Sequence, residues 1–482
     1  MAKSIKTNLI YSTLNTLLGV LYPLITIPYV SRVLQPEGFG LYNFLNSFIA
    51  YIVLFANIGI SVYATKEVAK IRDDKDKRSQ LTVEIFSLSI LTMLIAFSSV
   101  FVLISFVDKI HEQKELFLIM SLIVVFQPLG VNWFYQAMED FEYVTIRSLI
   151  VKVIAFVLLF VFVRSKNDLI PYAMLVVFAS CSNNLCNIIR LRKYISFKKI
   201  RFSELNIIRH LKPCLVLFVL DLLISIYTNM DILMLGFFKT DTEVGYYTIG
   251  VKITHLLLAI ISTIGMTLLP RFSYLLKEGL NEEFNRLCVK SMNLCIGISL
   301  PIVFGLIAIA NPVIPIVFGY EYMNSIAIVQ IMSSIILIAG ITNVLGIQIL
   351  LPKGKEKIVI YSTLAAAIVN FILNMILIPV LSGIGAAIST VVAELVVFIV
   401  QFFVGFKFFP NNIFSKQILD FIFGSLIMSV FLVVFRTLFI PPIWSVLLCV
   451  TIGALLYFIY LRLKQNELAM TIQGIVIKFV NR

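Results

Sequence analysis

Apolar residues fall into fourteen separate stretches, each long enough to cross a lipid bilayer as a helix. A transmembrane helix needs about 20 mostly apolar residues. The first seven stretches are Leu9–Ser31, Tyr42–Tyr63, Leu81–Val107, Leu116–Ala137, Ile146–Val163, Leu169–Ile189 and Pro213–Leu235. The other seven are Tyr246–Leu269, Val289–Ile309, Ser325–Leu351, Ile358–Val380, Ile384–Gly405, Ile418–Phe439 and Trp444–Leu461. Because these runs are too long and continuous for barrel strands, the pattern predicts an all-α polytopic membrane protein with about fourteen transmembrane helices.

The composition supports this fold class. Of the 482 residues, 60% are apolar and 13% are charged, whereas about 25% are charged in ordinary soluble domains. The net charge of +13 would suggest a nucleic-acid partner in a soluble protein, so the placement of the charge decides its meaning.

The basic residues lie mostly on one side of the predicted membrane. Thirty of the 39 Lys and Arg residues fall in segments on the side of the N-terminus, six on the other side and three within spans. Basic loops face the cytoplasm and contact anionic lipid head groups. The bias therefore favours two cytoplasmic termini and membrane lipids as partners, with no role for nucleic acid.

A weak internal repeat suggests two related halves. Gly40 matches Gly245 at an offset of 205 residues, and Asn57-Ile58-Gly59 matches Thr263-Ile264-Gly265 at an offset of 206. Six spans separate the matches, so the halves have parallel topology and a shared site between them. The predicted parts are a six-helix lobe at 1–189, a basic cytoplasmic linker at 190–212, a six-helix lobe at 213–406, and two additional helices with a cytoplasmic tail at 407–482.

Enzyme motifs are absent from the sequence. It contains no GxxxxGK[ST] phosphate loop and no HExxH, and its six cysteines form no CxxC pair. We therefore expect no catalytic residues, no cofactor and no metal. A membrane polymerase or ligase is disfavoured, because the predicted outer loops are short.

Charged residues within spans are costly, and each is a functional candidate. Glu394 lies roughly 15 Å into its span, where it could take up protons or pack as a neutral carboxyl. Asp221 lies nearer the cytoplasm. Asp231 and Lys252 lie at the same depth on the two sides of a helical hairpin. They are expected to form an ion pair, which either switches during transport or is a fixed structural salt bridge. His255, one turn from Lys252, lines a cavity or sits in packing.

Two further residue types in the spans bear on transport. Pro23 and Pro28 interrupt the first span, which predicts either a hinge or a static kink. Asparagine and glutamine side chains either contact sugar hydroxyls or join helices. They include Gln127, Asn132, Asn343, Gln348, Asn370 and Asn374.

The N-terminal segment carries a family resemblance. The stretches Leu18-Gly19-Val20-Leu21-Tyr22-Pro23, Ile27-Pro28-Tyr29, Arg32-Val33-Leu34 and Gly38-Phe39-Gly40-Leu41-Tyr42 resemble the opening of bacterial polysaccharide-exporting flippases. These belong to the multidrug/oligosaccharidyl-lipid/polysaccharide exporter superfamily. The resemblance is greatest to the O-antigen and capsule repeat-unit flippases, commonly called Wzx. It covers the whole chain in length, span count and central linker, and it is sharpest over residues 1–70.

The resemblance implies a function and its partners. It implies transfer of undecaprenyl-diphosphate-linked oligosaccharide from the cytoplasmic to the periplasmic leaflet of the bacterial inner membrane, by alternating access coupled to an ion gradient. Candidate protein partners are a polysaccharide polymerase and a chain-length regulator. Arg32 either snorkels to the interface or joins a cationic cavity, as arginines of the first helices do in related flippases. Lys152 either extends its ammonium group to the cytoplasmic interface or contacts the diphosphate of the substrate. The alternative is a multidrug or small-molecule exporter, which would need acidic residues in the N-terminal half.

Overall fold

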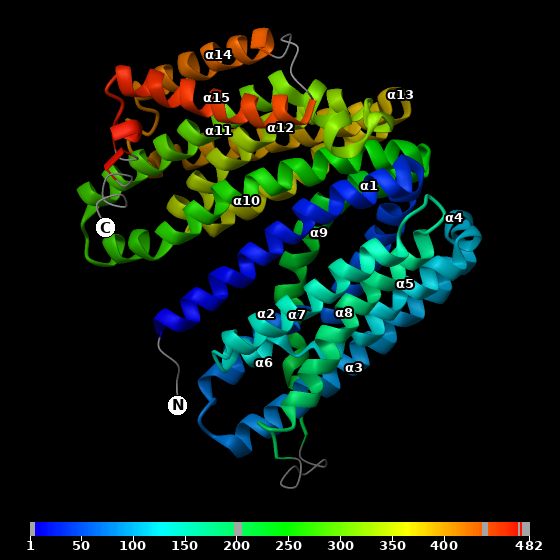
Figure 1. Ribbon diagram of the computed structural model, residues 1–482. Coiled ribbons are helices and arrows are strands. Elements are labelled where there is room, and N and C mark those ends of the chain that lie inside the picture. Colours follow the sequence, from blue (N-terminus) through cyan, green and yellow to red (C-terminus); the bar gives the residue numbers. More distant parts are fainter. Residues whose placement is uncertain (1–4, 197–204, 436–441, 471–472, 475–482) are drawn as a thin grey trace. The chain divides into compact units, whose positions relative to one another are not determined.

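The computed structural model describes residues 5–196, 205–435, 442–470 and 473–474. It divides into two compact units, Met1–Leu233 and Met234–Arg482, which are described separately below. Every regular element in the described residues is a helix, so the predicted all-α fold class is confirmed (Figure 1).

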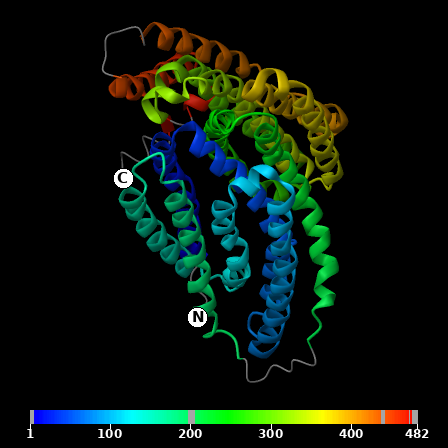
Figure 2. The ribbon, with the colours of Figure 1, turned by 90° about the vertical axis from the view of Figure 1, so that its right-hand side faces the viewer.

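The first unit is built from long helices and short breaks. Its helices are α1 (Ile5–Asn57), α2 (Ile60–Lys70), α3 (Lys75–Phe106), α4 (Asp108–Glu112), α5 (Lys114–Phe126), α6 (Asn132–Ala137), α7 (Phe141–Phe162), α8 (Leu169–Leu191) and most of α9 (Leu211–Phe238), with 3-10 turns η1 (Gln127–Gly130) and η4 (Ile208–His210). Helix α1 packs against α3, α5 and α7, and α8 packs against α5 and α7 (Figure 2).

The second unit has a central helix, α11. Its helices are α10 (Asp241–Lys277), α11 (Asn281–Phe318), α12 (Ser325–Asn343), α13 (Glu356–Gly405), α14 (Gln417–Phe435) and α15 (Pro442–Leu463), with the π-helix η6 (Val344–Leu350) and the 3-10 turns η5 (Tyr320–Tyr322) and η7 (Phe406–Phe408). Helices α10, α12, α14 and α15 all contact α11. Helices α14 and α15 pack on α11 and on each other, and they lie within 407–482.

Two of the helices are long enough for two spans each. Among the described residues, eleven helices are long and apolar enough to cross a membrane, or twelve if the bent pair Ile208–Leu223 and Thr228–Phe238 is counted as one span. Helix α1 has 53 residues and α13 has 50, whereas about 20 cross the hydrocarbon core. Each contains one non-helical residue, Gln35 or Ser382. The count of fourteen stays a prediction.

The break at Gln35 follows from its neighbour. Its φ of 58° and ψ of 173° lie outside the helical region. Pro36 comes next, and a proline ring disfavours the helical conformation of the preceding residue. The backbone is helical at Pro23 and Pro28, so the structure places its break of α1 seven residues beyond the second of the two predicted hinge prolines.

Parts of three predicted segments lie outside the described residues. These are 197–204 of the linker, 436–439 at the end of the predicted span Ile418–Phe439, and 471–472 and 475–482 of the C-terminal tail. The described end of the linker forms η4 and leads directly into α9.

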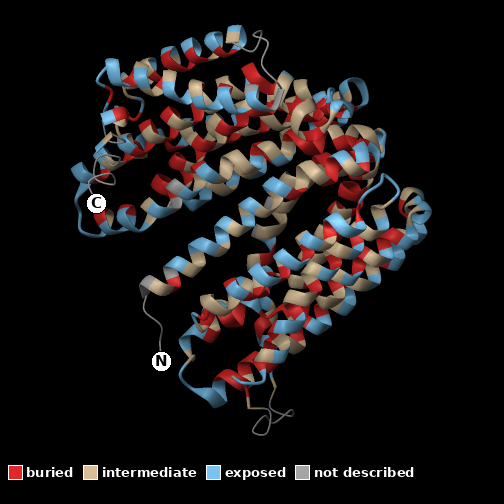
Figure 3. Ribbon diagram, viewed as in Figure 1, coloured by how far each residue is buried: buried red, intermediate tan, exposed pale blue. Residues whose placement is uncertain are grey.

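Burial follows the pattern of a membrane protein (Figure 3). Large apolar side chains face outward, including Phe403 and Val430, while Asn370, Asn374 and Ser389 are buried. Lipid accepts apolar side chains, whereas polar groups need partners inside the bundle. The outer faces therefore suit hydrocarbon.

Asp168 caps the loop before α8 and gives a pH prediction. Its Oδ2 accepts the backbone N–H groups of Arg164 (2.9 Å) and Ser165 (2.7 Å), and these bonds lower the pKa of the carboxyl. A lowered folded-state pKa stabilises the fold above the unfolded pKa, and this contribution is lost as the pH falls through the folded value. We expect Asp168→Asn to lower the unfolding temperature in detergent at pH 7, and to lower it by less at pH 3, which lies below the ordinary aspartate pKa of about 3.9. An equal difference at both pH values would contradict this reading.

Candidate functional site

A polar pocket lies in the first unit where two helices are interrupted. Helix α1 ends at Asn57, and Ile58 and Gly59 take left-handed conformations before α2 begins. Helix α5 passes into η1, and Val131 is also left-handed, with a φ of 32°. Breaks of this kind leave backbone carbonyls without helical donors, and within a membrane they are tolerated only where protein or a wet cavity satisfies them.

Asparagines on α8 supply the missing donors. Asn184 Nδ2 donates to the carbonyl of Phe126 at 3.1 Å, and Asn187 Nδ2 donates to that of Gly130. Pro128, which has no N–H, and Gly130 lie in the interrupted turn. A Cβ on Gly130 would lie 2.9 Å from Asn184 Oδ1, so the close approach depends on glycine.

The pocket itself is small and polar. Its volume is about 50 Å³, enough for a few water molecules but not for a sugar. Its polar wall consists of Asn57, Ser61, Ser89, Gln127, Asn132 and Asn184. Gln127 and Asn132 are among the polar span residues noted in the sequence.

Arg147 on α7 is a buried cation beside this pocket. It is 8% exposed, and its guanidinium donates to the amide oxygens of Asn183 (Nε, 3.0 Å), Asn132 (Nη2, 3.2 Å) and Asn187 (Nη1). Among the described residues no carboxylate lies within 4.0 Å of it. A buried charge needs hydrogen-bonding partners, and here three neutral amides provide them.

Arg147 was not predicted as a site residue, because it lies near a span end among the basic residues expected to face the cytoplasm. The sequence holds one signal. Asn183 and Asn187 are four residues apart and therefore share one face of α8. Two amide side chains on one face of a membrane helix call for a polar partner on a neighbouring helix.

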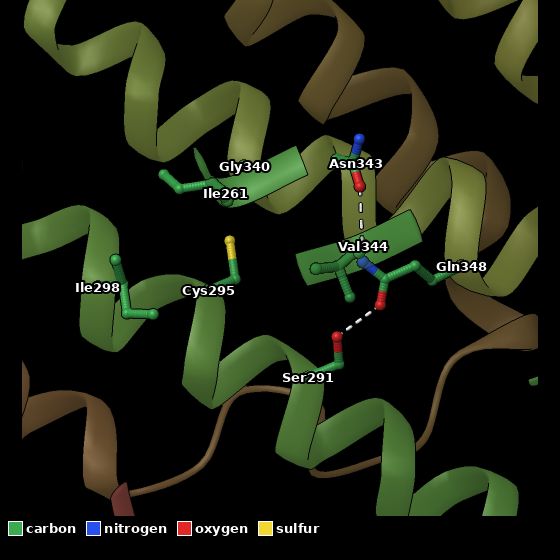
Figure 4. Close-up of a pocket in the computed structure, with 9 residues that line it drawn as sticks. Ile261, Ser291, Cys295, Ile298, Gly340, Asn343, Val344 and Gln348 are labelled. Atoms are coloured by element: carbon green, nitrogen blue, oxygen red, sulfur yellow. Dashed lines mark hydrogen bonds between the residues drawn. The ribbon is translucent and has the colours of Figure 1, made fainter. Parts of the chain in front are cut away.

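A second polar pocket lies in the second unit (Figure 4). Ser291 Oγ of α11 donates to Gln348 Oε1 at 2.5 Å, and Gln348 Nε2 lies 3.5 Å from Asn343 Oδ1. The pocket volume is about 10 Å³, roughly one water molecule. Gln348 belongs to the π-helix η6, and such bulges often occur at functional sites.

The two segments of the predicted repeat each border one of these pockets. Asn57 lines the pocket in the first unit, and Gly265 lines the pocket in the second. A Cβ on Gly265 would lie 2.5 Å from Gln348 Nε2 and 2.6 Å from Asn343 Oδ1. Segments that match at an offset of 206 residues thus border a polar pocket in each unit.

The charged candidates from the sequence lie elsewhere on the helices. In the first unit, Arg32 is exposed on α1, Lys152 and Asp221 are half-buried on α7 and α9, and Asp231 is 2% exposed on α9. In the second unit, Lys252 and His255 are exposed on α10 and Glu394 is half-buried on α13. As far as the structure describes the chain, none of the seven lines either polar pocket. Lys252 and His255 share one face of α10, whereas the Asp231–Lys252 pair stays a prediction.

Glu84 is the acidic residue within the first six predicted spans, near an interface. Its side chain is fully buried and hydrogen-bonded. Its carboxylate accepts Arg209 Nη2 at 2.5 Å and His210 Nε2 at 2.8 Å. His210 Nδ1 lies 2.8 Å from the hydroxyl of Tyr63. This network ties the end of the linker to α2 and α3.

Comparisons with known proteins agree with the fold and the resemblance. A protein of Escherichia coli (strain K12) described as an O-antigen transporter is 28% identical over 382 residues, covering 77% of this chain and 89% of that protein. A structure of the lipid II flippase MurJ, inward closed, has a TM-score of 0.74 at 16% identity and covers 94% of this chain and 97% of that one. An inward-facing multidrug resistance transporter of the MATE family has a TM-score of 0.64 at 16% identity, covering 83% of this chain and 97% of that one.

The structural matches show a shared fold and do not separate a lipid flippase from a drug exporter. The sequence goes further. The family described as polysaccharide biosynthesis protein matches residues 5–276, which is more than half of the chain. The resemblance seen at the N-terminus is thereby confirmed, and the chain belongs to the polysaccharide biosynthesis protein family.

Proposed function

We propose that the protein translocates undecaprenyl-diphosphate-linked oligosaccharide repeat units from the cytoplasmic to the periplasmic leaflet, for O-antigen or capsular polysaccharide synthesis. The observation that carries the proposal is the match of residues 5–276 to the polysaccharide biosynthesis protein family. The relative described as an O-antigen transporter and the fold that 94% of this chain shares with a lipid II flippase support it.

The proposed transport separates the two parts of the substrate. The prenyl tail stays in lipid, which suits the apolar outer faces of the helices, while the sugar-diphosphate head passes through a polar cavity. Arg32, Lys152, Lys252 and His255 are the proposed lining. The exposure of Lys252 and His255 on one face of α10 supports a role in contact with the head group. An arginine fork suits diphosphate well, because it is planar and bidentate.

Proposed coupling to an ion gradient rests on three carboxylates. Glu394, Asp221 and Asp231 lie on the apolar helices α13 and α9, where a carboxylate is costly unless it is protonated or paired. Alternating uptake and release of a cation at such a group changes the relative energies of two conformations. Pro23 and Pro28 of α1 are the proposed hinge of the conformational change.

The protein is a multi-pass membrane protein, and we place it in the bacterial inner membrane with both termini in the cytoplasm. The basic residues of the predicted inner loops support this orientation. Its proposed partners are the lipid-linked oligosaccharide, membrane lipids, and a polysaccharide polymerase with its chain-length regulator.

The alternative is a multidrug exporter, and the shared MATE fold favours it. A cationic drug needs an acidic partner inside the first lobe. Glu84, the acidic candidate there, already accepts bonds from Arg209 and His210, and Arg147 adds a buried positive charge. The first unit therefore favours an anionic substrate. Unchanged drug susceptibility in a deletion strain would support this choice.

The transport proposal predicts the phenotype of two variants. In a strain lacking the native gene, Lys252→Ala and Glu394→Gln are expected to insert normally but to reduce export about tenfold or more, because each removes a charged contact worth about 1.5–3 kcal/mol. Lipid-linked repeat units should accumulate in the cytoplasmic leaflet, measured by lipid extraction and mass spectrometry.

Matched controls lie on the same two helices. Lys277→Ala on α10 and Glu356→Gln on α13 change the same charges at exposed helix ends. They should export normally. Full export by both Lys252→Ala and Glu394→Gln would contradict these site assignments.

A further inference from the structure

A basic pocket of about 460 Å³ lies in the first unit, between α2, α3 and η4. Its wall contains three cations from three different elements, Lys70, Lys77 and Arg209, and one carboxylate, Glu67. The remaining lining residues are Tyr63, Ile71, Gln80, Leu81 and His210. This end of the unit carries the basic loop 66–78, which the sequence assigns to the cytoplasm.

The floor of the pocket is a fixed, buried network. Glu84 is 0% and His210 is 2% exposed. Besides Arg209 and His210, Glu84 Oε1 accepts the backbone N–H of Asn206 at 3.2 Å and Gln80 Nε2 at 3.3 Å. Arg209 is therefore held at the pocket wall by a carboxylate that itself makes several bonds. A cation positioned in this way is organised for a ligand in advance.

The other two cations are held less firmly. Lys70 Nζ lies 2.6 Å from Glu67 Oε1, and Lys77 Nζ lies 3.3 Å from Asp74 Oδ2. The two lysine side chains are 55% and 75% exposed and that of Arg209 is 51% exposed, but the carboxylates of Glu67 and Asp74 are 28% and 42% exposed, whereas that of Glu84 is 0% exposed. Exposed ion pairs contribute little, about 0–1 kcal/mol, so a ligand can replace these contacts at small cost.

We propose that this pocket binds a phosphate-class anion, with Arg209 as the fixed donor and Lys70 and Lys77 as the mobile ones. Arginine binds phosphate oxygens in bidentate fashion and lysine supplies point charges, a combination common in phosphate sites. Such an anion has two sources at a membrane surface, namely the diphosphate of a lipid-linked substrate and the head group of an anionic phospholipid. The first source rests on the proposed function, and the second does not.

The test is a binding measurement on the purified full chain with inorganic pyrophosphate as the probe. In neutral detergent, calorimetry should show binding that weakens with salt. Lys70→Gln/Lys77→Gln should bind at least about tenfold more weakly, because it removes two charged donors. Both side chains are exposed, so the variant is expected to fold. The control Lys66→Gln/Lys75→Gln makes the same charge change on α2 and α3 outside the pocket and should bind as the wild type does.

Nanodiscs separate the two sources. If pyrophosphate binds more weakly in phosphatidylglycerol than in phosphatidylcholine discs, and this difference is lost in Lys70→Gln/Lys77→Gln, the head group occupies the pocket. Equal pyrophosphate binding in both kinds of disc assigns the pocket to the diphosphate of the lipid-linked substrate. No pyrophosphate binding, or equal binding by the two double variants, would overturn the proposal. Export is assayed separately. Pyrophosphate binding without export would therefore contradict the proposed function but not the proposed anion site.

Discussion

Arg147→Leu is expected to lower the free energy of unfolding by about 3 kcal/mol, because it removes three hydrogen bonds made by a charged group and leaves the buried amide oxygen of Asn187 without its donor, at a cost of about 1–3 kcal/mol. Asn132, Asn183 and Asn187 all lose a guanidinium bond. Asn132 and Asn187 also adjoin the interrupted helix of the first unit, so its packing should loosen. Thermal unfolding in detergent, followed by size-exclusion chromatography, measures the effect.

Two further variants isolate the geometry of the guanidinium. Arg147→Lys keeps the charge but cannot reach three acceptors in a fork, so it should recover less than half of the lost stability. Arg192→Leu removes an exposed arginine just past α8 and should change stability little. Wild-type stability in Arg147→Leu would show that the three asparagines do not depend on this cation.

Gly59→Ala is expected to be at least as severe, at about 3–5 kcal/mol, because it combines left-handed strain with a steric clash. Gly59 has a φ of +75°, and a Cβ there would lie 2.5 Å from the carbonyl oxygen of Cys214 and 2.9 Å from the amide nitrogen of Phe218. These are backbone atoms of α9, which cannot swing aside. The variant should be recovered in low yield, with a reduced unfolding temperature.

The repeat provides a matched control. Gly265→Ala makes the same change 206 residues later, but its Cβ meets only the side-chain ends of Gln348 and Asn343, and its φ is not left-handed. Its cost should be about 1 kcal/mol, from the weakened amide contacts. Gly19→Ala, in an open position of α1, should be neutral or slightly stabilising. Equal costs at Gly59 and Gly265 would contradict the backbone-clash argument.

The helices could be predicted because each depends on local composition. An apolar run of about 20 residues has few alternatives to a membrane helix, and α7 and α8 match their predicted spans closely. The breaks at Ile58 and Val131 were not predicted, because left-handed conformations at non-glycine residues depend on tertiary packing. The break at Ser382 falls in the gap between the predicted spans Ile358–Val380 and Ile384–Gly405. The break at Gln35 carried a local signal in Pro36.

The polar contacts were harder to predict because their partners are distant in sequence. Glu84 lies within the predicted span Leu81–Val107, but its partner His210 lies 126 residues away. Arg147 was counted with the loop residues, because the sequence does not distinguish a basic residue in a loop from a buried one at the end of a span. Asn132 and Gln127 were noted as polar span residues, yet no spacing rule brings them to Asn184. The sequence shows which polar residues within spans need hydrogen-bonding partners, but the packing of the helices determines which partners they have.

The central claim is that this chain moves a lipid-linked oligosaccharide across a bilayer, and reconstitution tests it most directly. The purified chain is placed in liposomes that contain a fluorescent undecaprenyl-diphosphate-linked oligosaccharide on both leaflets, with an ion gradient imposed and a membrane-impermeant glycosidase added outside. We expect cleavage to extend beyond the outer leaflet to the inner-leaflet pool, and to slow in Glu394→Gln. Cleavage that stops at the outer-leaflet share, as in protein-free liposomes, would contradict the account.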